Sequence, residues 1–545
     1  MQVQSQLNAK KVCSSEENQF DVGIVGSGIS GSILAAILAK HNVRVLLIDA
    51  DSHPKFAIGE STVPHTSKML ELMGDRYGVP ELKNLATFQD IRQKVTSSCG
   101  IKLGFGFVYH RQEEDQNPQQ VTQTLIPGQP ENHWYRQDID SYMFHTAIRY
   151  GTECRQKTKI IDINIDEQGV DLKTEQGEKF RVKYLVDGSG YRSPLAQKFD
   201  LRETPTRMKT HSRTVFTHMV GVKPYEDCVH PKNVLDQPVS WSQCTLHHIF
   251  DGGWMWVIPF NNHKDATNPL CSVGLCLDSR RFPKNDTPPE AEWKQFLARF
   301  PSIAKQFEEA KPVRSWTSTS RLQYSVKKCV GDRYCLTSHA AGFIDALFSR
   351  GLANTTAIID ALANRILQAV ADNDFSTEHF EYIEQLQQNT INYNDQLVNC
   401  SYISFRDFDL WNAWFRMWYL AVGLGGLRLG MMHKKFIITD DPSALPDAHE
   451  PLGLFNIDPK NEEFRKLWDA AVAIVESVDT GETAPKDAAQ KIMTMLDLAD
   501  FLPPALRLSD PSKRYIDFTT DDINLHFLSW KTFSTRSEME AIYSI

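Results

Sequence analysis

Short apolar runs and longer helical runs alternate along the chain, and the first of them form a compact pattern. An apolar run at 20–25 leads into the turn Gly26–Gly31, which is followed by a helical stretch that ends near His41. A second apolar run, Val43–Ile48, ends in Asp49. Short apolar runs rich in β-branched residues predict buried strands, and a longer run predicts a helix. The N-terminal part is therefore expected to fold as strand, turn, helix and strand.

The turn after the first predicted strand has the glycine spacing of a dinucleotide site. Gly26 allows a tight turn, Gly28 lets backbone N–H groups approach a diphosphate, and Gly31 lets the helix pack on the strand. Asp49 follows after roughly the 20 residues at which a carboxylate meets a ribose hydroxyl. An acid there disfavours the 2′-phosphate of NADP, so the site is expected to hold FAD or NAD. The glycines at 423–426 have no preceding strand, and we expect no second nucleotide site there.

Helical and strand-rich stretches alternate over the remainder of the chain. Periodicity predicts helices at Ser67–Met73 and from Tyr135 onward, and turn-forming composition predicts an exposed loop at Glu113–Pro130. The last ~160 residues are expected to be mainly helical. Strand-rich stretches are expected at 160–170, 184–186 and 214–277, and a glycine-rich loop followed by a helix at 342–367.

Composition narrows the class of protein. The 545 residues suffice for two or more domains, and the net charge of −9 without a basic run argues against nucleic acid as a partner. Ten cysteines without metal-binding spacing indicate reduced thiols in a cytoplasm, and no metal site is expected. Residues 1–17 are polar, without the apolar run of a signal peptide. The most apolar stretch, Trp414–Met432, is interrupted by Arg416 and Arg428, so no membrane span is expected.

Three stretches carry a family resemblance: Gly59–Pro64, Trp254–Pro259 and Gly342–Gly351. They are similar to the signature stretches of flavin-dependent halogenases, and the similarity extends over about residues 18–420. Two further stretches, Ser98–Phe105 and Thr245–Phe250, resemble the phenol-halogenase branch with its bacterial phloroglucinol halogenases. The resemblance implies an α/β fold: a Rossmann-like composite FAD-binding domain of the aromatic-hydroxylase type, with an inserted substrate sheet and a mainly helical C-terminal part.

This order of pieces divides the chain into a core and a C-terminal region. The FAD-binding halogenase core is expected at 18–395, and the mainly helical region at 396–545. Within the core, nucleotide-binding pieces are expected at about 18–75, 134–195 and 325–385, and sheet-rich substrate pieces at about 76–133 and 196–324.

The family chemistry is the halogenation, by chloride or bromide, of an electron-rich phenolic substrate through a flavin hydroperoxide and hypohalous acid. The resemblance makes Lys102 the catalyst, since its ammonium can hydrogen-bond hypohalous acid or, once deprotonated, become a haloamine. Burial would lower its pKa from about 10.4 and favour the second route. With one dinucleotide fingerprint, reduced FAD is expected from a separate flavin reductase. The phenol arrives free or tethered to a carrier protein.

The resemblance also assigns the surroundings of Lys102. Chloride or bromide is placed at Ser349, Arg350 and Gly351, in a loop before a helix whose N–H groups can hold an anion. Trp254, Trp256 and Pro259 are expected to wall the substrate off from the flavin. The expected FAD contacts are Gly26, Ser27, Gly28, Ile29, Ser30, Gly31, Asp49, Ala50, Ile58, Gly59, Glu60, Ser61, Arg136, Asp187, Gly342, Asp345, Gly351 and Leu352.

Departures from the family pattern refine the expected substrate. Tryptophan halogenases carry a glutamate where this chain has Phe348, and a phenol needs no such carboxylate because its oxygen already activates the ring. Ser338 and His339 replace a Gly-Asp pair, and Ala346 replaces a proline, which alters the ribityl contact and the stiffness of the halide loop. Two alternatives remain open at this point: a flavin-dependent aromatic hydroxylase, and a degenerate FAD-binding protein without turnover.

The strand after Lys102 is a candidate lining of the substrate pocket. Strand alternation predicts Phe105, Phe107 and Tyr109 on one face and His110 on the other. Aromatic residues of the C-terminal part are expected to close the cavity: Phe405, Phe408, Trp411, Trp414 and Trp418.

Overall fold

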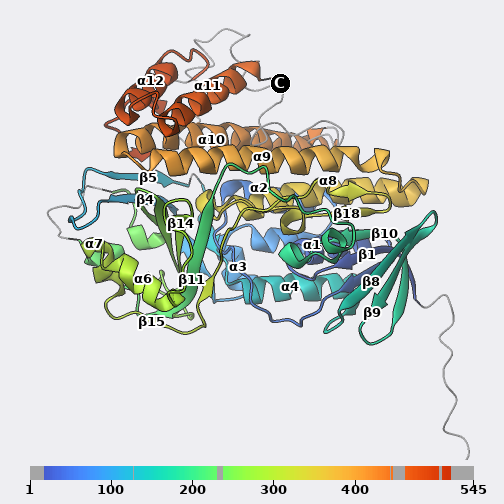
Figure 1. Cartoon of the computed structure of the whole chain (residues 1–545). Helices are drawn as coiled ribbons and strands as arrows, with labels where there is room; N and C mark the ends of the chain where they lie inside the picture. Colours follow the sequence, from blue (N-terminus) through green and yellow to red (C-terminus); the bar gives the residue numbers. More distant parts are fainter. Residues whose placement is uncertain are drawn as a thin grey trace, which may run out of the picture.

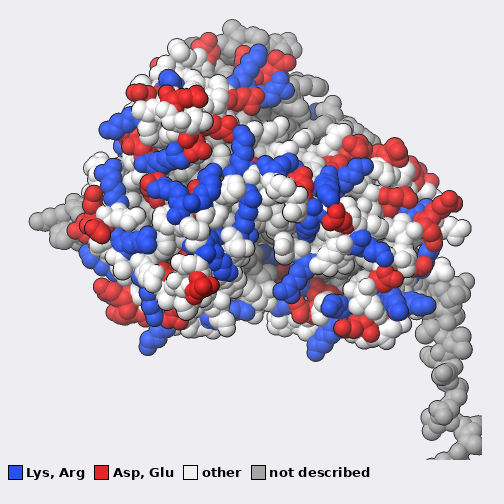
Figure 2. Space-filling model, viewed as in Figure 1, with Lys and Arg blue, Asp and Glu red and all other residues white. Residues whose placement is uncertain are grey.

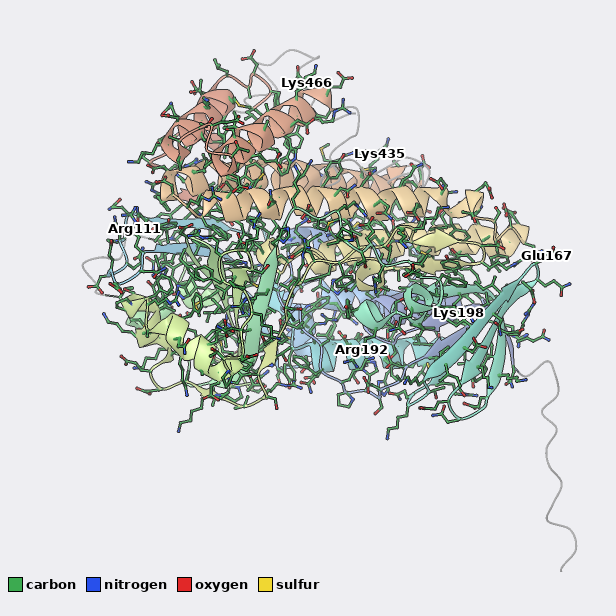
Figure 3. All side chains as sticks on the ribbon, viewed as in Figure 1. Arg111, Glu167, Arg192, Lys198, Lys435 and Lys466 are labelled. Carbon is green, nitrogen blue, oxygen red and sulfur yellow. The ribbon has the colours of Figure 1, made fainter. Side chains whose placement is uncertain are left out.

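Two sheets lie side by side beneath a layer of long helices in the computed structural model (Figure 1). It describes residues 18–126, 128–229, 237–441, 444–445, 461–502 and 506–516. Charged side chains of both signs are interspersed over the face shown in Figure 2. In Figure 3, Glu167 marks the tip of a hairpin at the right, and Lys435 and Lys466 lie on the helical layer.

The 8-stranded sheet is the nucleotide-binding one, with the order β17-β18-β10-β1-β2-β7 and with β9 and then β8 continuing from β10. β1, β2, β7, β10 and β18 pair in parallel, so their carboxyl ends meet at one edge. The strands are β1 (Gln19–Val25), β2 (Val45–Ile48), β7 (Glu153–Arg155), β8 (Ile160–Asp166), β9 (Gly169–Thr174), β10 (Lys179–Asp187), β17 (Val330–Gly331) and β18 (Tyr334–Leu336).

Three helices belong to this sheet. α1 (Ile29–Lys40) packs between α4 (Arg136–Arg149) and α8 (Arg350–Asp372). α1 is buried from Ile29 to Ala39, as its apolar sequence on every face requires. The start of α1 therefore lies at the carboxyl ends of the strands, the edge at which open α/β sheets bind ligands.

The 9-stranded sheet has the order β15-β11-β14-β13-β12-β4-β5-β19, with β16 paired to β11. β13, which carries the double-tryptophan motif, lies in its interior between β12 and β14. The strands are β4 (Gly104–His110), β5 (Val121–Leu125), β11 (Ser212–Val220), β12 (Cys244–Phe250), β13 (Gly253–Pro259), β14 (Cys271–Asp278), β15 (Lys311–Pro312), β16 (Thr317–Ser318) and β19 (Tyr515–Ile516).

One sequence prediction fails in this sheet. The stretch Glu113–Pro130, expected to be an exposed loop, contains the largely buried strand β5. The Thr and Gln side chains of β5 make its sequence polar, so the pattern did not predict a strand, although β5 pairs with β4. The C-terminal part is mainly helical, as predicted, and it also contributes β19, which pairs in parallel with β5.

A separate two-stranded pair carries the catalytic candidate. β3 (Gly100–Lys102) runs antiparallel to β6 (Glu131–His133), with Lys102 opposite Glu131. A Cβ atom on Gly100 would lie 2.4 Å from the carbonyl oxygen of Pro259. Only glycine therefore allows β3 to approach the end of β13 this closely.

The helical layer covers the 9-stranded sheet and closes its aromatic face. α10 (Phe408–Thr439) begins at Asp407, whose carboxylate caps the helix by accepting from the backbone N–H groups of Asp409 and Leu410. None of the helices in the described ranges has the length and apolarity that a membrane crossing requires. The other helices are α2 (Pro64–Arg76), α3 (Phe88–Lys94), α5 (Pro194–Lys198), α6 (Pro289–Leu297), α7 (Pro301–Ala304), α9 (Glu381–Ser404), α11 (Glu462–Asp479) and α12 (Pro485–Asp497).

Candidate active site

The turn before α1 is shaped by its three glycines. Gly26 has φ of 99°, and a Cβ atom on it would lie 2.7 Å from the carbonyl oxygen of Gly188. A Cβ atom on Gly31 would lie 1.9 Å from the carbonyl oxygen of Gly26, so helix and turn touch through glycine alone. At Gly28, the N-cap of α1, a Cβ atom would meet nothing within 4 Å, and no side chain caps the helix. The start of α1 is thus an open cradle that fits a diphosphate.

Asp49 closes the far side of this cradle. Its carboxylate accepts from the backbone N–H of Ser27 at 2.6 Å and from the Ser27 hydroxyl at 2.8 Å, and it pairs with the ammonium of Lys55. Burial raises the pKa of Asp49, but Lys55 and the N–H donors outweigh burial and bring that pKa below its ordinary value. The group stays a carboxylate at the end of β2, where it suits a ribose hydroxyl. Ala50, the next residue, is exposed.

Arg136 links α4 to the segment that precedes α2. Its buried guanidinium pairs with Asp140 through two hydrogen bonds of 2.8 and 2.9 Å. It also donates to the carbonyl oxygens of Ile58 at 2.9 Å and Gly59 at 3.0 Å. The side chain of the next residue, Glu60, accepts from the backbone N–H of Gly59 and lies 3.1 Å from Nε2 of His218. Arg136 therefore fixes the backbone of the Gly59–Pro64 signature stretch.

His339 stands where the family pattern has an aspartate. Burial, and to a smaller extent the charge of Arg136, lower the pKa of His339 to about 4, so the ring is neutral. A Cβ atom on Gly351 would lie 3.4 Å from Nε2 of His339. A pocket opens beside these groups, lined among others by Gly342, Asp345, Gly351 and, from α9, Asn394. The structure thus brings His339 to the start of α8, and Ser30 of α1 lies 3.4 Å from the hydroxyl of Ser338.

Two predicted cofactor residues use their carboxylates on the protein itself. Asp187 accepts from the backbone and hydroxyl of Ser189, from the hydroxyl of Ser193 and from the backbone of Leu195. Asp345 accepts from Ser212, Tyr402 and the backbone N–H of Leu347. Both carboxylates therefore shape turns beside the cradle and the halide loop.

The halide loop is strained where it enters α8. Phe348 and Ser349 both have a left-handed backbone, with φ of 66° and 55°. This conformation costs roughly 1 kcal/mol for a residue with a side chain. No side-chain hydrogen bond caps α8 at its N-cap, Ser349, so this helix start lacks a side-chain cap. An anion fits there without a bound cation.

Lys102 is fully buried and is held by the signature stretch. Its Nζ donates to the Ser61 hydroxyl at 2.8 Å and to the Thr62 carbonyl at 2.7 Å, and lies 3.5 Å from the centroid of the Phe105 ring. Burial lowers the pKa of Lys102 to about 7, while the nearby charge of Glu131 acts in the opposite direction. Burial raises the pKa of Glu131 to about 6, although its carboxylate accepts from Thr62 and Ser67. Lys102 can therefore gain or lose a proton near neutral pH.

An aromatic cluster between β4 and α10 reaches this lysine through Phe105 and includes Phe348 from the loop before α8. The Phe105 and Trp418 rings lie 5.1 Å apart, those of Phe107 and Trp411 5.0 Å, and those of Phe348 and Trp418 4.5 Å. Strand alternation is confirmed, because Phe105, Phe107 and Tyr109 face the cluster and His110 faces the other core. The members of the cluster are Phe105, Phe107, Phe348, Trp411, Phe415 and Trp418.

The double-tryptophan wall borders the same cluster. Trp254 and Trp256 are buried on one face of β13, with ring centroids 5.7 Å apart. The Trp256 ring lies against Gly274 of β14, where a Cβ atom would come within 2.0 Å of it. Its indole N–H donates to the Ser272 hydroxyl at 3.2 Å. The carbonyl of Pro259, at the end of the motif, lies 3.0 Å from Nδ1 of His133.

Sequence reasoning missed Glu131 and His133, the two ionisable groups on the strand opposite Lys102. Both are buried, at 4% and 0% exposure, yet the local sequence Glu131–His133 is polar throughout. Polar residues in a short strand give no periodic signal of burial. The pairing of β3 with β6 alone brings them to the lysine.

Comparisons with known proteins identify the family of the chain. Residues 19–337 match the family described as "FAD binding domain". The chain is 48% identical to monodechloroaminopyrrolnitrin halogenase PrnC of Pseudomonas fluorescens, over 90% of this chain and 86% of that protein. It is 46% identical to the tetracycline 7-halogenase of Kitasatospora aureofaciens, over 96% and 95%. The crystal structure of halogenase PltM with phloroglucinol and FAD superimposes with a TM-score of 0.88 at 34% identity, covering 92% of this chain and 100% of that one.

Proposed function

The chain belongs to the flavin-dependent halogenases, and from this premise we propose that it halogenates an electron-rich phenolic ring under the guidance of Lys102. FAD-dependent halogenation follows from the family itself. Relatives at 46–48% identity are halogenases, which decides against the aromatic hydroxylase and the degenerate protein that the sequence had left open. The substrate class and the role of Lys102 are the parts that need support from the geometry.

The buried position of Lys102 is the observation that carries the proposal. When bound in reduced form, FAD supplies, with O2, the oxidising power that converts halide into hypohalous acid. An ammonium has three N–H donors, and two of those on Lys102 are used by Ser61 and Thr62. The third serves the hypohalous acid, whose oxygen accepts it while the halogen meets the ring. Since water is excluded around Lys102, this hydrogen bond is stronger than it would be in solution.

The surroundings of Lys102 give each partner a place. The uncapped start of α1, with Asp49 and Arg136 beside it, suits the diphosphate and ribose of FAD. The uncapped start of α8 suits chloride or bromide. Trp254 and Trp256 separate these polar sites from the aromatic cluster, where a ring can stack. Because the sequence has one dinucleotide fingerprint, we also propose that a separate flavin reductase supplies the reduced FAD.

The aromatic cluster favours a phenol as the substrate. Phe348 presents a ring, not a carboxylate, to the cluster, so the enzyme relies on a substrate whose own oxygen donates electrons. Phloroglucinol, bound by PltM, and tetracycline, in the name of the 7-halogenase, both contain a phenolic ring. A ring of this kind can lie against Phe105 or Trp418 by aromatic stacking.

The test is a reconstituted reaction with mass-spectrometric detection. Purified protein is supplied with FAD, a flavin reductase, NADH, and chloride or bromide, together with a panel of phenols that includes phloroglucinol and resorcinol. We expect a product with the halogen isotope pattern that disappears when halide is omitted. Gain of oxygen in place of halogen would contradict the proposal, as would halogenation confined to substrates without a ring hydroxyl.

A further inference from the structure

A chain of buried polar groups continues from Lys102 into the 9-stranded sheet. Beyond the Lys102–Ser61 contact, the Ser61 hydroxyl lies 2.6 Å from Oγ1 of Thr245, which lies 3.1 Å from Nε2 of His133. Nδ1 of His133 lies 3.0 Å from the carbonyl oxygen of Pro259. Ser61, Thr245 and His133 are buried, at 6%, 1% and 0% exposure. One continuous path therefore joins the lysine to the end of the double-tryptophan strand.

The hydrogen bonds along this path can point in only one direction while Lys102 is charged. A carbonyl oxygen only accepts, so Nδ1 of His133 must carry a proton. Burial and the charge of Lys102 lower the pKa of His133 to about 3, so the ring is neutral and its Nε2 accepts. The Thr245 hydroxyl must then donate to His133, which leaves the Ser61 hydroxyl to donate to Thr245 and Lys102 to donate to Ser61.

We propose that Ser61, Thr245 and His133 form a proton relay through which Lys102 can change its charge without contact with bulk water. This inference rests on the proposed role of Lys102. One proton moves from Nζ of Lys102 to the Ser61 hydroxyl, the Ser61 proton moves to Thr245, and the Thr245 proton moves to Nε2 of His133. Both hydroxyls end with one proton each. The net change is a neutral Lys102 amine and a His133 imidazolium, and no bond between heavy atoms changes.

The relay serves both reactions open to Lys102. A neutral amine can react with hypohalous acid, so that an N–halogen bond forms and water leaves. When the ammonium instead guides hypohalous acid, a proton that Lys102 has passed to His133 can return along the same path and restore the charge of Lys102. Loss of the Lys102 charge also removes one of the two causes that lower the pKa of His133, so proton binding at the two groups is coupled.

Few titratable groups face this relay from the surrounding elements. Glu131 on β6 and Cys244 on β12 act on Lys102, and both raise its pKa. Lys102 in turn lowers the pKa of His247, which burial already brings to about 3. Burial raises the pKa of the Cys244 thiol to about 12, so it stays protonated at neutral pH. Glu131 is thus the one titrating neighbour that these contacts place beside Lys102 near neutral pH.

The experiment measures single-turnover halogenation, with FAD reduced beforehand, in mixtures of H2O and D2O. If several protons move in the rate-limiting step, a plot of the rate against the deuterium fraction is curved. If one proton moves, the plot is a straight line. We expect curvature in the wild type and in Thr245→Ser. Thr245→Val should lower the rate of halogenation by about tenfold, which is less than the ~10²–10⁴-fold lost when a whole acid–base group is removed. The curvature should disappear in this variant. Oxidation of reduced FAD should not change.

Controls separate the relay from packing and from the proposed function. Thr146→Val removes an equally buried hydroxyl, bonded to the carbonyl of Tyr142 on α4, and should keep both rate and curvature. His133→Gln retains an acceptor but cannot take up a proton, so it should lose the curvature, and it decides the matter if Thr245→Val does not fold. Wild-type rate and curvature in Thr245→Val, with Lys102→Ala inactive, would overturn the relay alone. Normal halogenation by Lys102→Ala would overturn the role of Lys102 as well.

Discussion

Lys102 and Glu131 are register partners on β3 and β6, and they are joined through Thr62 and not by a direct ion pair. The Thr62 carbonyl accepts from Lys102, and the Thr62 hydroxyl donates to Glu131 at 2.6 Å. A buried lysine without compensation would be neutral at physiological pH. The carboxylate of Glu131 offsets part of the burial, so the pKa of Lys102 is about 7. The charge of Lys102 therefore depends on the strand opposite to it.

Glu131→Gln should move the pH dependence of halogenation to lower pH. Removal of the carboxylate takes away the largest influence that raises the pKa of Lys102, so this pKa falls below about 7. If the ammonium guides the hypohalous acid, activity is lost as pH rises through this pKa, and the loss begins at lower pH in the variant. If the neutral amine reacts, activity appears as pH rises, and it appears at lower pH. The rate of halogenation from pH 5 to 9 measures the shift.

The matched control for this prediction is Glu81→Gln, since Glu81 also accepts a hydrogen bond, from Tyr150, but lies outside the site. Its profile should coincide with that of the wild type. A Glu131→Gln profile with the wild-type midpoint would show that Glu131 does not set the charge of Lys102.

Lys102→Ala should separate oxidation of the flavin from halogenation of the substrate. The side chain touches neither α1 nor the start of α8, so oxidation of reduced FAD should continue at a rate near that of the wild type. Halogenated product should fall by at least ~100-fold, the scale of one acid–base group. Oxygen consumption and product mass are measured in the same reaction. Product at the wild-type level would remove Lys102 from the mechanism.

The nucleotide fold and the family were predictable because their signals are local. The structure shows the tight turn at Gly26 and the close helix packing at Gly31. The approach of a cofactor to Gly28 stays a prediction. The resemblance to flavin-dependent halogenases is likewise confirmed, and the comparison with phloroglucinol-bound PltM agrees with the phenol-halogenase branch. Trp411, Trp414 and Trp418 are buried in the core.

Features that depend on contacts distant in sequence could not be predicted. β5 looked like a polar loop because its burial comes from β4 and β19, and β19 lies almost 400 residues away, at 515–516. His133 and Thr245 are 112 positions apart and meet only because β6 lies against β12. Asp345 was expected at the cofactor, yet Ser212 and Tyr402, from two other elements, take up its carboxylate.

Gly28→Asp should weaken FAD binding while the fold is retained. The residue is the N-cap of α1 with an extended backbone, and a side chain there meets nothing within 4 Å. Asp is a favourable N-cap and should hold stability within about 0.5 kcal/mol of the wild type. Its charge, however, occupies the place proposed for the diphosphate, and like charges in contact cost enough to weaken binding by at least ~10-fold.

The readouts for this variant are the melting temperature and FAD affinity by fluorescence quenching. Gly28→Ser is the matched control, because it caps the helix without a charge. If Gly28→Asp bound FAD as tightly as Gly28→Ser, the diphosphate would not lie at the start of α1.

Gly274→Ala should displace the ring of Trp256, which belongs to the proposed tryptophan wall. A Cβ atom at this position would come within 2.0 Å of the Trp256 ring, so the indole must shift from β14 and give up its hydrogen bond to Ser272. Overpacking of this kind costs about 1–3 kcal/mol. Because the wall is proposed to keep the substrate away from the flavin, less of the reduced FAD that is oxidised should yield halogenated product. The ratio of product to oxidised FAD, measured at equal folded protein, is the decisive quantity.

Gly423→Ala, in α10 with nothing within 4 Å of its Cβ atom, should leave this ratio unchanged. The double variant Gly274→Ala with Trp256→Phe should recover stability, because the smaller ring leaves room for the methyl group. A wild-type ratio in a folded Gly274→Ala protein would mean that the position of Trp256 matters only for packing.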